Sequence, residues 1–113
     1  MSRIYKILPR WEWEAALAVR RFDGSGVDVQ DGFIHFSTAE QAQETARRHF
    51  AGQEDLVVLA VEAAELGHAL RWERSRGGEL FPHLYAHLDT ALVRKVSEAP
   101  LGADGAPQVQ GLG

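Results

Sequence analysis

A short segment near residue 35 carries polar groups in an arrangement that suits a binding site on a sheet. Residues 33–37 have the sequence Phe-Ile-His-Phe-Ser and the apolar character of a short strand. Because side chains alternate between the two faces of a strand, Phe33, His35 and Ser37 would point one way, and the residues between them the other. That face would offer an imidazole and a hydroxyl beside an aromatic ring.

A second segment, 82–88, repeats this pattern with the sequence Pro-His-Leu-Tyr-Ala-His-Leu. In a strand, His83, Tyr85 and His87 would share one face, and the leucines would take the other. If both segments belong to one sheet, two histidines, a hydroxyl and a tyrosine converge on one side. These groups supply donors, acceptors and a stacking surface, which suit an amide, ribose hydroxyls or a phosphate better than a metal ion.

Two hydroxyl residues, Ser37 and Thr38, stand where the first strand ends and a helix begins. Ser37 and Glu40 have the spacing of a capping box, in which the serine oxygen accepts a backbone N–H and the glutamate reaches back. A helix N-terminus also favours anions through its free N–H groups and its dipole. A phosphorylated or carboxylated small ligand would therefore fit beside His35, although many capping boxes bind nothing.

Several of these residues also have a structural interpretation. A strand histidine is most often structural or solvated, and side chains such as those of His83 and Tyr85 pack readily on sheet faces. His49 and His68 lie near a helix end and in a connector, where surface positions are expected. The tryptophans fit the core or its rim better than a ligand platform, because large aromatic side chains dominate burial. They are Trp11, Trp13 and Trp72.

Metal binding and nucleophilic catalysis have little support in the sequence. His83 and His87 have the HxxxH spacing that suits zinc on a helix, but in a strand they lie about 13 Å apart, too far to share an ion. The absence of cysteine excludes disulfides, thiolate metal sites and thiol nucleophiles. The Gly-x-Ser-x-Gly elbow of serine hydrolases and the glycine-rich phosphate loops are absent too. We therefore expect no metal site.

Glu73 is the carboxylate best placed to act beside the histidines. It follows Arg71 and Trp72 in a segment, 70–74, with the pattern of a strand. Its carboxylate could orient a ribose or stabilise a cation, and it could equally be a solvated strand residue.

Hydrophobic periodicity and turn residues define the elements that must position these side chains. We expect strands at 3–8, 32–36, 56–61, 70–74, 84–88 and 91–96, helices at 10–21 and from about 39 to 50, and loops at 22–32 and 75–79. The segment 56–61 is apolar without alternation, which is typical of a central strand covered on both faces. A helix beginning at Pro82 competes with the strands of 84–96, because Leu84, Leu88 and Leu92 also have helical spacing.

The order of these elements predicts an α+β fold. We expect one compact domain over residues 1–101, with a mixed, mostly antiparallel sheet and two main helices. A chain of 113 residues is long enough for one hydrophobic core and short for two. From Gly102 the sequence is rich in glycine, proline and glutamine, and 102–113 is expected to be a mobile C-terminal tail.

Charge and composition limit the partners. The formal net charge is -4 and no basic run appears, which argues against nucleic acid. Only a clustered basic face built from the arginines would revive a nucleic-acid module. No apolar run approaches the roughly 20 residues that span a bilayer, and the N-terminal residues lack a signal-peptide core. We expect a cytoplasmic protein with no nucleic-acid or membrane partner, and favour a monomer.

Four blocks of sequence together resemble a known family. They are Ile4-Tyr5-Lys6-Ile7, the run from Asp31 to Gln41, Leu70-Arg71-Trp72-Glu73 and Phe81-Pro82-His83-Leu84-Tyr85. In this order they resemble the small bacterial domain-of-unknown-function family 952, over about residues 2–101. That family is grouped by fold similarity with the ADP-ribosyltransferase-like proteins. The resemblance implies a split, mostly antiparallel sheet with a cleft that holds NAD in active relatives.

The resemblance also implies roles for single residues. In such enzymes a strand histidine followed by a small hydroxyl residue binds the ribose and amide of the nicotinamide side, which matches His35 with Ser37 or Thr38. A tyrosine that stacks on the nicotinamide ring matches Tyr85. This chain departs from the family's Tyr-Gly step, because Ala86 follows the tyrosine.

The glutamate that assists ADP-ribose transfer in such enzymes has no clear counterpart in this sequence. Glu73 precedes Tyr85 in the chain, and Glu98 matches by position alone. Because the family has no established activity, enzymatic function is an expectation from fold analogy.

The sequence therefore predicts that NAD or an ADP-ribose-like nucleotide binds in a His/Ser/Tyr cleft, with NAD as the one candidate cofactor. In the catalytic version the domain transfers or hydrolyses ADP-ribose, with His35, Tyr85 and Glu73 as catalytic residues. The ligand-binding residues would be Ser37, Thr38, Trp72, His83 and Phe33. The alternative is a non-enzymatic module that binds a small molecule or a protein and lacks the catalytic glutamate.

Overall fold

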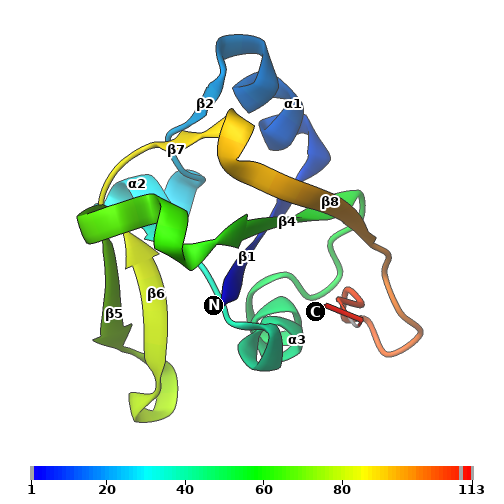
Figure 1. Ribbon diagram of the computed structural model, residues 1–113. Helices are drawn as coiled ribbons and strands as arrows, with labels where there is room; N and C mark the ends of the chain where they lie inside the picture. The colour runs from blue at the N-terminus through cyan, green and yellow to red at the C-terminus, as the bar shows by residue number, and fades with distance from the viewer. Residues whose placement is uncertain (1, 110, 113) are drawn as a thin grey trace.

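The computed structural model describes residues 2–109 and 111–112, and Figure 1 shows the order of its elements. The strands are β1 (Arg3–Pro9), β2 (Arg21–Phe22), β3 (Ile34–His35), β4 (Leu56–Glu62), β5 (Leu70–Arg74), β6 (Leu80–Leu84), β7 (Leu88–Asp89) and β8 (Val93–Ala99). The α-helices are α1 (Arg10–Val19), α2 (Gly26–Asp31) and α3 (Ala39–His49), and short 3-10 helices cover Ala63–Ala69, Arg76–Gly78 and Thr90–Leu92. Met1, in the predicted domain, and Gln110 and Gly113, in the predicted tail, lie outside the described residues.

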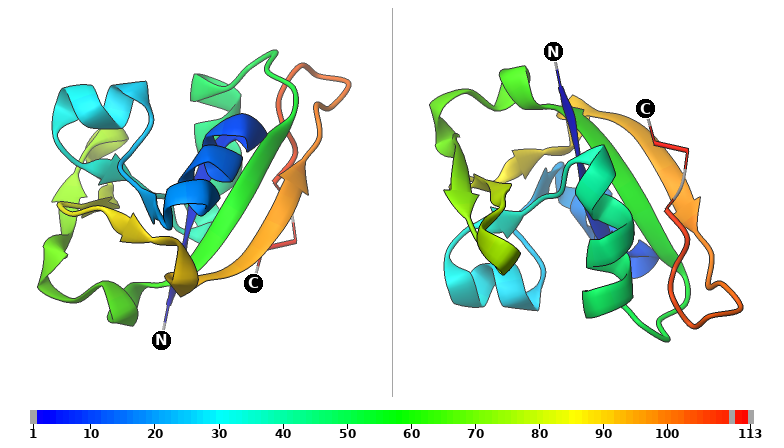
Figure 2. Two further views of the ribbon diagram at one scale, coloured as in Figure 1. Left: turned by 90° about the horizontal axis from the view of Figure 1, so that it is seen from above. Right: turned by 90° about the horizontal axis from the view of Figure 1, so that it is seen from below.

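The larger of the two main sheets has the order β1-β4-β8 and is antiparallel. Its central strand, β4, is buried along the whole apolar run from Leu56 to Val61. Val57 and Leu59 share a core with residues of α1, whereas Val58 shares a core with residues of α3. Figure 2 shows these two helices on opposite faces of the sheet. The prediction of a central strand covered on both faces is therefore confirmed. Because both faces of β4 are buried, its side chains are apolar on each side and do not alternate with polar ones.

The smaller main sheet has the order β3-β6-β5 and is also antiparallel. Tyr5 of β1 and Ser37 connect it to the larger sheet by exchanging two backbone hydrogen bonds of 2.8 Å. One of its faces, which includes Ile34, packs into the core beneath α1. Since side chains alternate along a strand, His35 and His83 lie on the opposite face.

The predicted fold class is confirmed at the level of an α+β domain with antiparallel pairing. The sheet is divided into the two main sheets and a short β2–β7 pair. Among the described residues, no helix is both long and apolar enough to cross a membrane.

Helix α2 corrects the prediction of a loop over 22–32. Gly24, Gly26 and Asp31 suggested turns, but the helix begins after Ser25 and ends where Gly32 takes a left-handed φ of 89°. The carboxylate of Asp28 in the first turn accepts a hydrogen bond from the Ser25 backbone N–H at 2.9 Å. Asp28 is also buried against other elements, so tertiary contacts stabilise a helix too short to be stable alone.

The N-terminus of α3 corrects the predicted capping box by one residue. Thr38, rather than Ser37, is the N-cap, and its hydroxyl accepts the Gln41 backbone N–H at 3.2 Å. The Gln41 side chain accepts the Thr38 N–H at 3.1 Å in return. Ser37 is unsuited to this role because its backbone is already bonded to β1.

The segment after Pro82 forms strands rather than the competing helix, but the predicted bounds of 84–88 are wrong. Strand β6 ends at Leu84, and β7 begins only at Leu88. The chain leaves the ladder at Tyr85, whose N–H donates to the carbonyl of Ala69 at 2.8 Å.

The predicted tail makes ordered contacts as far as residue 109. Ala106 and Val109 are buried, and Leu101 forms an isolated bridge with Pro107. The amide of Gln43 on α3 donates to the Pro107 carbonyl at 2.9 Å and accepts the Val109 N–H at 3.0 Å. Mobility of the 102–113 tail stays a prediction.

Replacing this amide tests the docking of the segment. We expect Gln43→Ala to lower the free energy of unfolding by about 1–2 kcal/mol, because two hydrogen bonds to the backbone are lost. Amide hydrogen exchange at Val109 should become faster in the variant. The control is Glu40→Ala, an exposed change on the same helix. Unchanged exchange at Val109 would contradict the role of Gln43.

Candidate functional site

His35 of β3 and His83 of β6 are direct partners in the register of the smaller sheet. Their rings lie 5.5 Å apart, centroid to centroid, at an interplanar angle of 68°. Both side chains line a cavity of about 550 Å³. The structure therefore brings together the two segments that alternation placed on one face.

The cavity is lined by residues of β1, the smaller sheet and helix α3, and also by residues of α1 and α2. Lys6 of β1 lines it, together with Thr45 and His49 of α3. Ser37 lines it too, and its buried hydroxyl is 2.9 Å from that of Thr45. His49 is exposed, as expected for a residue near a helix end, and it also borders the cavity.

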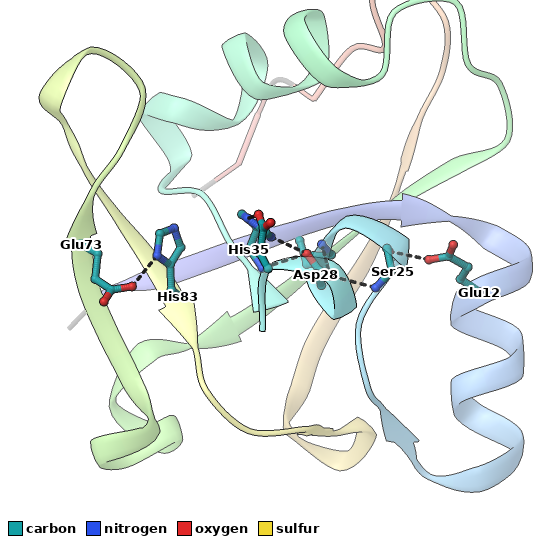
Figure 3. A network of polar contacts seen from close by, with 8 residues as sticks. Glu12, Ser25, Asp28, His35, Glu73 and His83 are labelled. Carbon is teal, nitrogen blue, oxygen red and sulfur yellow. Dashed lines mark hydrogen bonds and ion pairs between the residues drawn. The ribbon is translucent and has the colours of Figure 1, made fainter. Parts of the chain in front are cut away.

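Carboxylates hold both nitrogens of the His35 ring. Nδ1 lies 2.6 Å from Oδ1 of Asp28, and Nε2 lies 3.0 Å from Asp31. Asp28 also accepts the backbone N–H of His35 at 3.2 Å. Figure 3 shows Asp28 between His35 and Ser25, whose hydroxyl donates in turn to Glu12 at 2.6 Å. These bonds fix the orientation of the imidazole before any ligand arrives.

Asp28 also forms a buried ion pair with Lys6, at 2.7 Å between Oδ2 and Nζ. Burial alone would raise the pKa of Asp28, but the hydrogen bond with His35 and the charge of Lys6 lower it to about 2. Burial lowers the pKa of Lys6, and the Asp28 carboxylate opposes that shift. The two charges therefore depend on one another in a site that water scarcely reaches.

Glu73 of β5 bonds to both polar groups on the outer part of this face. One of its oxygens, Oε1, lies 2.8 Å from Nδ1 of His83 and accepts the Tyr85 hydroxyl at 2.8 Å. The hydrogen bonds with His83 and Tyr85 lower the pKa of Glu73, and the bond to Glu73 raises the pKa of Tyr85. At neutral pH Glu73 is a carboxylate and Tyr85 a neutral phenol.

Phe33 packs at the centre of these rings. Its ring stacks on that of His83 at 4.1 Å and 28°, with His35 at 4.5 Å and Tyr85 at 5.2 Å. Arg71 covers the Tyr85 ring, with its guanidinium carbon 4.9 Å from the centroid. Phe33, His35, Glu73, His83 and Tyr85 thus form one cluster, which we call the histidine cluster. Only its two histidines line the cavity.

Other predicted residues lie elsewhere. Thr38 caps α3 and is not among the residues that line the cavity. Trp72 lies on the opposite face of β5 from Glu73, because side chains alternate. Glu98 forms an ion pair with Arg10 at 2.5 Å on the exposed edge of the larger sheet.

The sequence interpretation missed Lys6, Asp28 and Asp31. Ser25 and Asp28 have the same capping spacing that was recognised at 37–40, so this signal was present. Lys6 inside an apolar strand was a second signal, because a lysine is almost never buried without a partner. Among the described residues, no group of three or more possible ligands lies close enough to hold a metal ion.

These features define an α+β domain with a cavity walled by two carboxylate-bound histidines. The chain belongs to the DUF952 family, described as a protein of unknown function, whose profile matches residues 7–96. No curated protein matches the sequence.

Solved structures of a related protein have the same fold. The crystal structure of CC0527 from Caulobacter crescentus, a structural-genomics target, is 58% identical, covers 95% of this chain and 94% of its own, and has a TM-score of 0.93. The solution NMR structure of CC0527 is also 58% identical, covers 96% of this chain and 93% of its own, and has a TM-score of 0.86.

The buried ion pair gives a pH-dependent prediction. We expect Asp28→Asn to lower the free energy of unfolding at about pH 7 by about 3–5 kcal/mol, because it leaves Lys6 without its counter-charge. The folded pKa of Asp28 is about 2, below its ordinary 3.8, so the carboxylate stabilises the fold above roughly pH 4 and this contribution fades toward pH 2. The difference between wild type and variant should therefore shrink by about 2 kcal/mol on acidification.

Urea unfolding across this pH range measures that difference. Glu44→Gln is the control, because the pKa of Glu44 is also about 2 but its side chain is exposed on α3. If the difference in free energy of unfolding between wild type and Asp28→Asn stayed constant with pH, Asp28 would not be an ionised partner in the fold.

Proposed function

We propose that this domain binds NAD or an ADP-ribose-like nucleotide in the cavity lined by His35 and His83. The observation that carries the proposal is the pairing of two histidines across β3 and β6 at a cavity wall, each held by a carboxylate. His83 is held through Nδ1 and can bind a hydroxyl or amide group of such a ligand through Nε2. Nε2 of His35 can do the same once the ligand displaces the exposed side chain of Asp31. The resemblance to ADP-ribosyltransferase-like proteins, which we infer to extend to the fold, suggests NAD as the first ligand to test.

Size and composition of the cavity support a small organic ligand. A volume of about 550 Å³ lies within the range of roughly 300–1,000 Å³ that is usual for such sites. Phe36, Phe50 and Phe81 line it beside the polar groups, which suits a ligand with a planar ring. We propose a cytoplasmic, monomeric protein that acts on this ligand without nucleic acid or membrane.

If the domain is an enzyme that uses NAD, the bond between the nicotinamide nitrogen and C1′ of the ribose breaks in the reaction. Nicotinamide leaves with the bonding electrons, and the cationic ribose is captured by water or by another acceptor, which then loses a proton. An ionised carboxylate near C1′ would stabilise that cation. Glu73 is the candidate, because its bonds to His83 and Tyr85 lower its pKa and keep it ionised.

One observation favours the non-enzymatic alternative. Glu73 bonds to the histidine cluster but does not line the cavity, whereas His35 and His83 do. A ligand held in the cavity could then be bound without being cleaved. Binding and turnover therefore need separate experiments.

Titration with NAD and with ADP-ribose, followed by NMR, tests binding. We expect signals of His35 and His83 to move at millimolar ligand, and His35→Ala to weaken binding at least tenfold, or about 1.4 kcal/mol. His68→Ala is the matched control, because His68 is exposed in the 3-10 helix before β5. If neither ligand moves the His35 and His83 signals, the domain does not bind this class of nucleotide.

Release of nicotinamide from NAD tests turnover. We expect Glu73→Gln to reduce the rate by roughly 100-fold or more if the carboxylate stabilises the cationic ribose, with little change in NAD affinity. Glu79→Gln is the control, because Glu79 is an exposed glutamate immediately before β6. Wild-type protein that binds NAD but releases no nicotinamide above the His35→Ala background would identify a binding module.

A further inference from the structure

Lys6 has more hydrogen-bonding capacity than the protein uses. An ammonium group carries three N–H donors. The Asp28 carboxylate takes one of them at 2.7 Å, and among the described residues no other acceptor lies within hydrogen-bond distance. The centroid of the Phe22 ring lies 6.0 Å from the ammonium nitrogen, at the limit of a cation–π contact. Two donors of a side chain that is only 5% exposed therefore have no acceptor among the described residues.

These donors belong to a group that lines the cavity. Lys6 contributes to the same wall as His35, to which it is linked through the two oxygens of Asp28. Buried polar groups are nearly always satisfied by protein, water or ligand. The ammonium group can therefore donate to an acceptor atom of a ligand in the cavity.

The charges around Lys6 indicate which kind of ligand group would accept its hydrogen bond. Asp28 already neutralises Lys6, so the ammonium group has spare donors but little spare charge. The carboxylate of Glu12, which also lines the cavity, acts on Lys6 as well, so the end of the cavity beside Lys6 disfavours an anionic group of the ligand. An uncharged oxygen, such as that of a carboxamide, satisfies the donors without adding negative charge.

We propose that Lys6 anchors the ligand of this cavity by donating to the carbonyl oxygen of a planar aromatic carboxamide. The ring of that ligand lies among the aromatic side chains of the cavity, and its carbonyl oxygen points toward β1. Lys6 is thereby a specificity-determining residue that selects an amide over the corresponding acid. This inference rests on the proposed function, since nicotinamide is the carboxamide part of NAD.

The chain itself supplies a control for the test, because Lys6 and the exposed Lys95 are its only lysines. Full-length protein labelled with ¹³C at the lysine ε-carbon gives one signal from each. The probes are nicotinamide and nicotinate, which share a ring and differ in the amide or carboxylate. We expect nicotinamide to shift the Lys6 signal and not that of Lys95, and nicotinate to bind at least tenfold more weakly.

The second part of the experiment measures nicotinamide binding to variants in which one lysine is replaced. Lys6→Met should weaken nicotinamide binding at least tenfold, whereas Lys95→Met should leave it unchanged. Since Lys6→Met removes the partner of Asp28 and could unfold the protein, the comparison of the two probes on wild-type protein stands without it.

The outcomes separate this inference from the proposed function. If nicotinamide or NAD shifts His35 and His83 while Lys6 stays unmoved, or if nicotinate binds as tightly as nicotinamide, the role of Lys6 is overturned and nucleotide binding stands. If NAD, ADP-ribose and nicotinamide move no signal of the cavity, the proposed function fails, and this inference fails with it.

Discussion

A lysine and an aspartate that are both buried connect three elements of this domain. Lys6 comes from β1, Asp28 from α2, and the other oxygen of the Asp28 carboxylate binds His35 of β3. A buried charge is unfavourable unless a partner neutralises it, so neither residue can adopt its position without the other. The backbone makes room for this contact at Gly24, where a Cβ atom would lie 2.7 Å from Cβ of Asp28 and φ is +113°. The position of α2, and with it the orientation of His35, depends on this one interaction.

The second histidine is positioned by different means. His83 lies in β6, between β3 and β5, so it is held by the ladder on both sides. Glu73 fixes its Nδ1 from the neighbouring strand, and the Phe33 ring stacks on its face. The two imidazoles therefore meet in a fixed arrangement although their carboxylate partners come from separate parts of the chain (Figure 3). Such preorganisation favours ligand binding, because little side-chain freedom remains to be lost.

The parts of the fold that follow from local pattern could be predicted from the sequence. The continuous apolar run of β4 indicated a central strand, and period-two alternation placed His35 and His83 on one face. The parts that depend on contacts distant in the chain could not. Asp28 stands 22 residues from Lys6, and its burial is visible only once β1 and α2 are adjacent. Alternation along β5 also places Trp72 on the opposite face from Glu73, so the two side chains cannot belong to one site on this sheet.

The central claim is that the cavity walled by His35 and His83 is a nucleotide-binding site. A crystal structure of the protein grown with saturating ADP-ribose or NAD tests it most directly. The account predicts density for the ligand inside the cavity, with ribose or amide atoms within hydrogen-bond distance of both histidines. Ordered water alone in the cavity, or a ligand bound elsewhere on the surface, would contradict it.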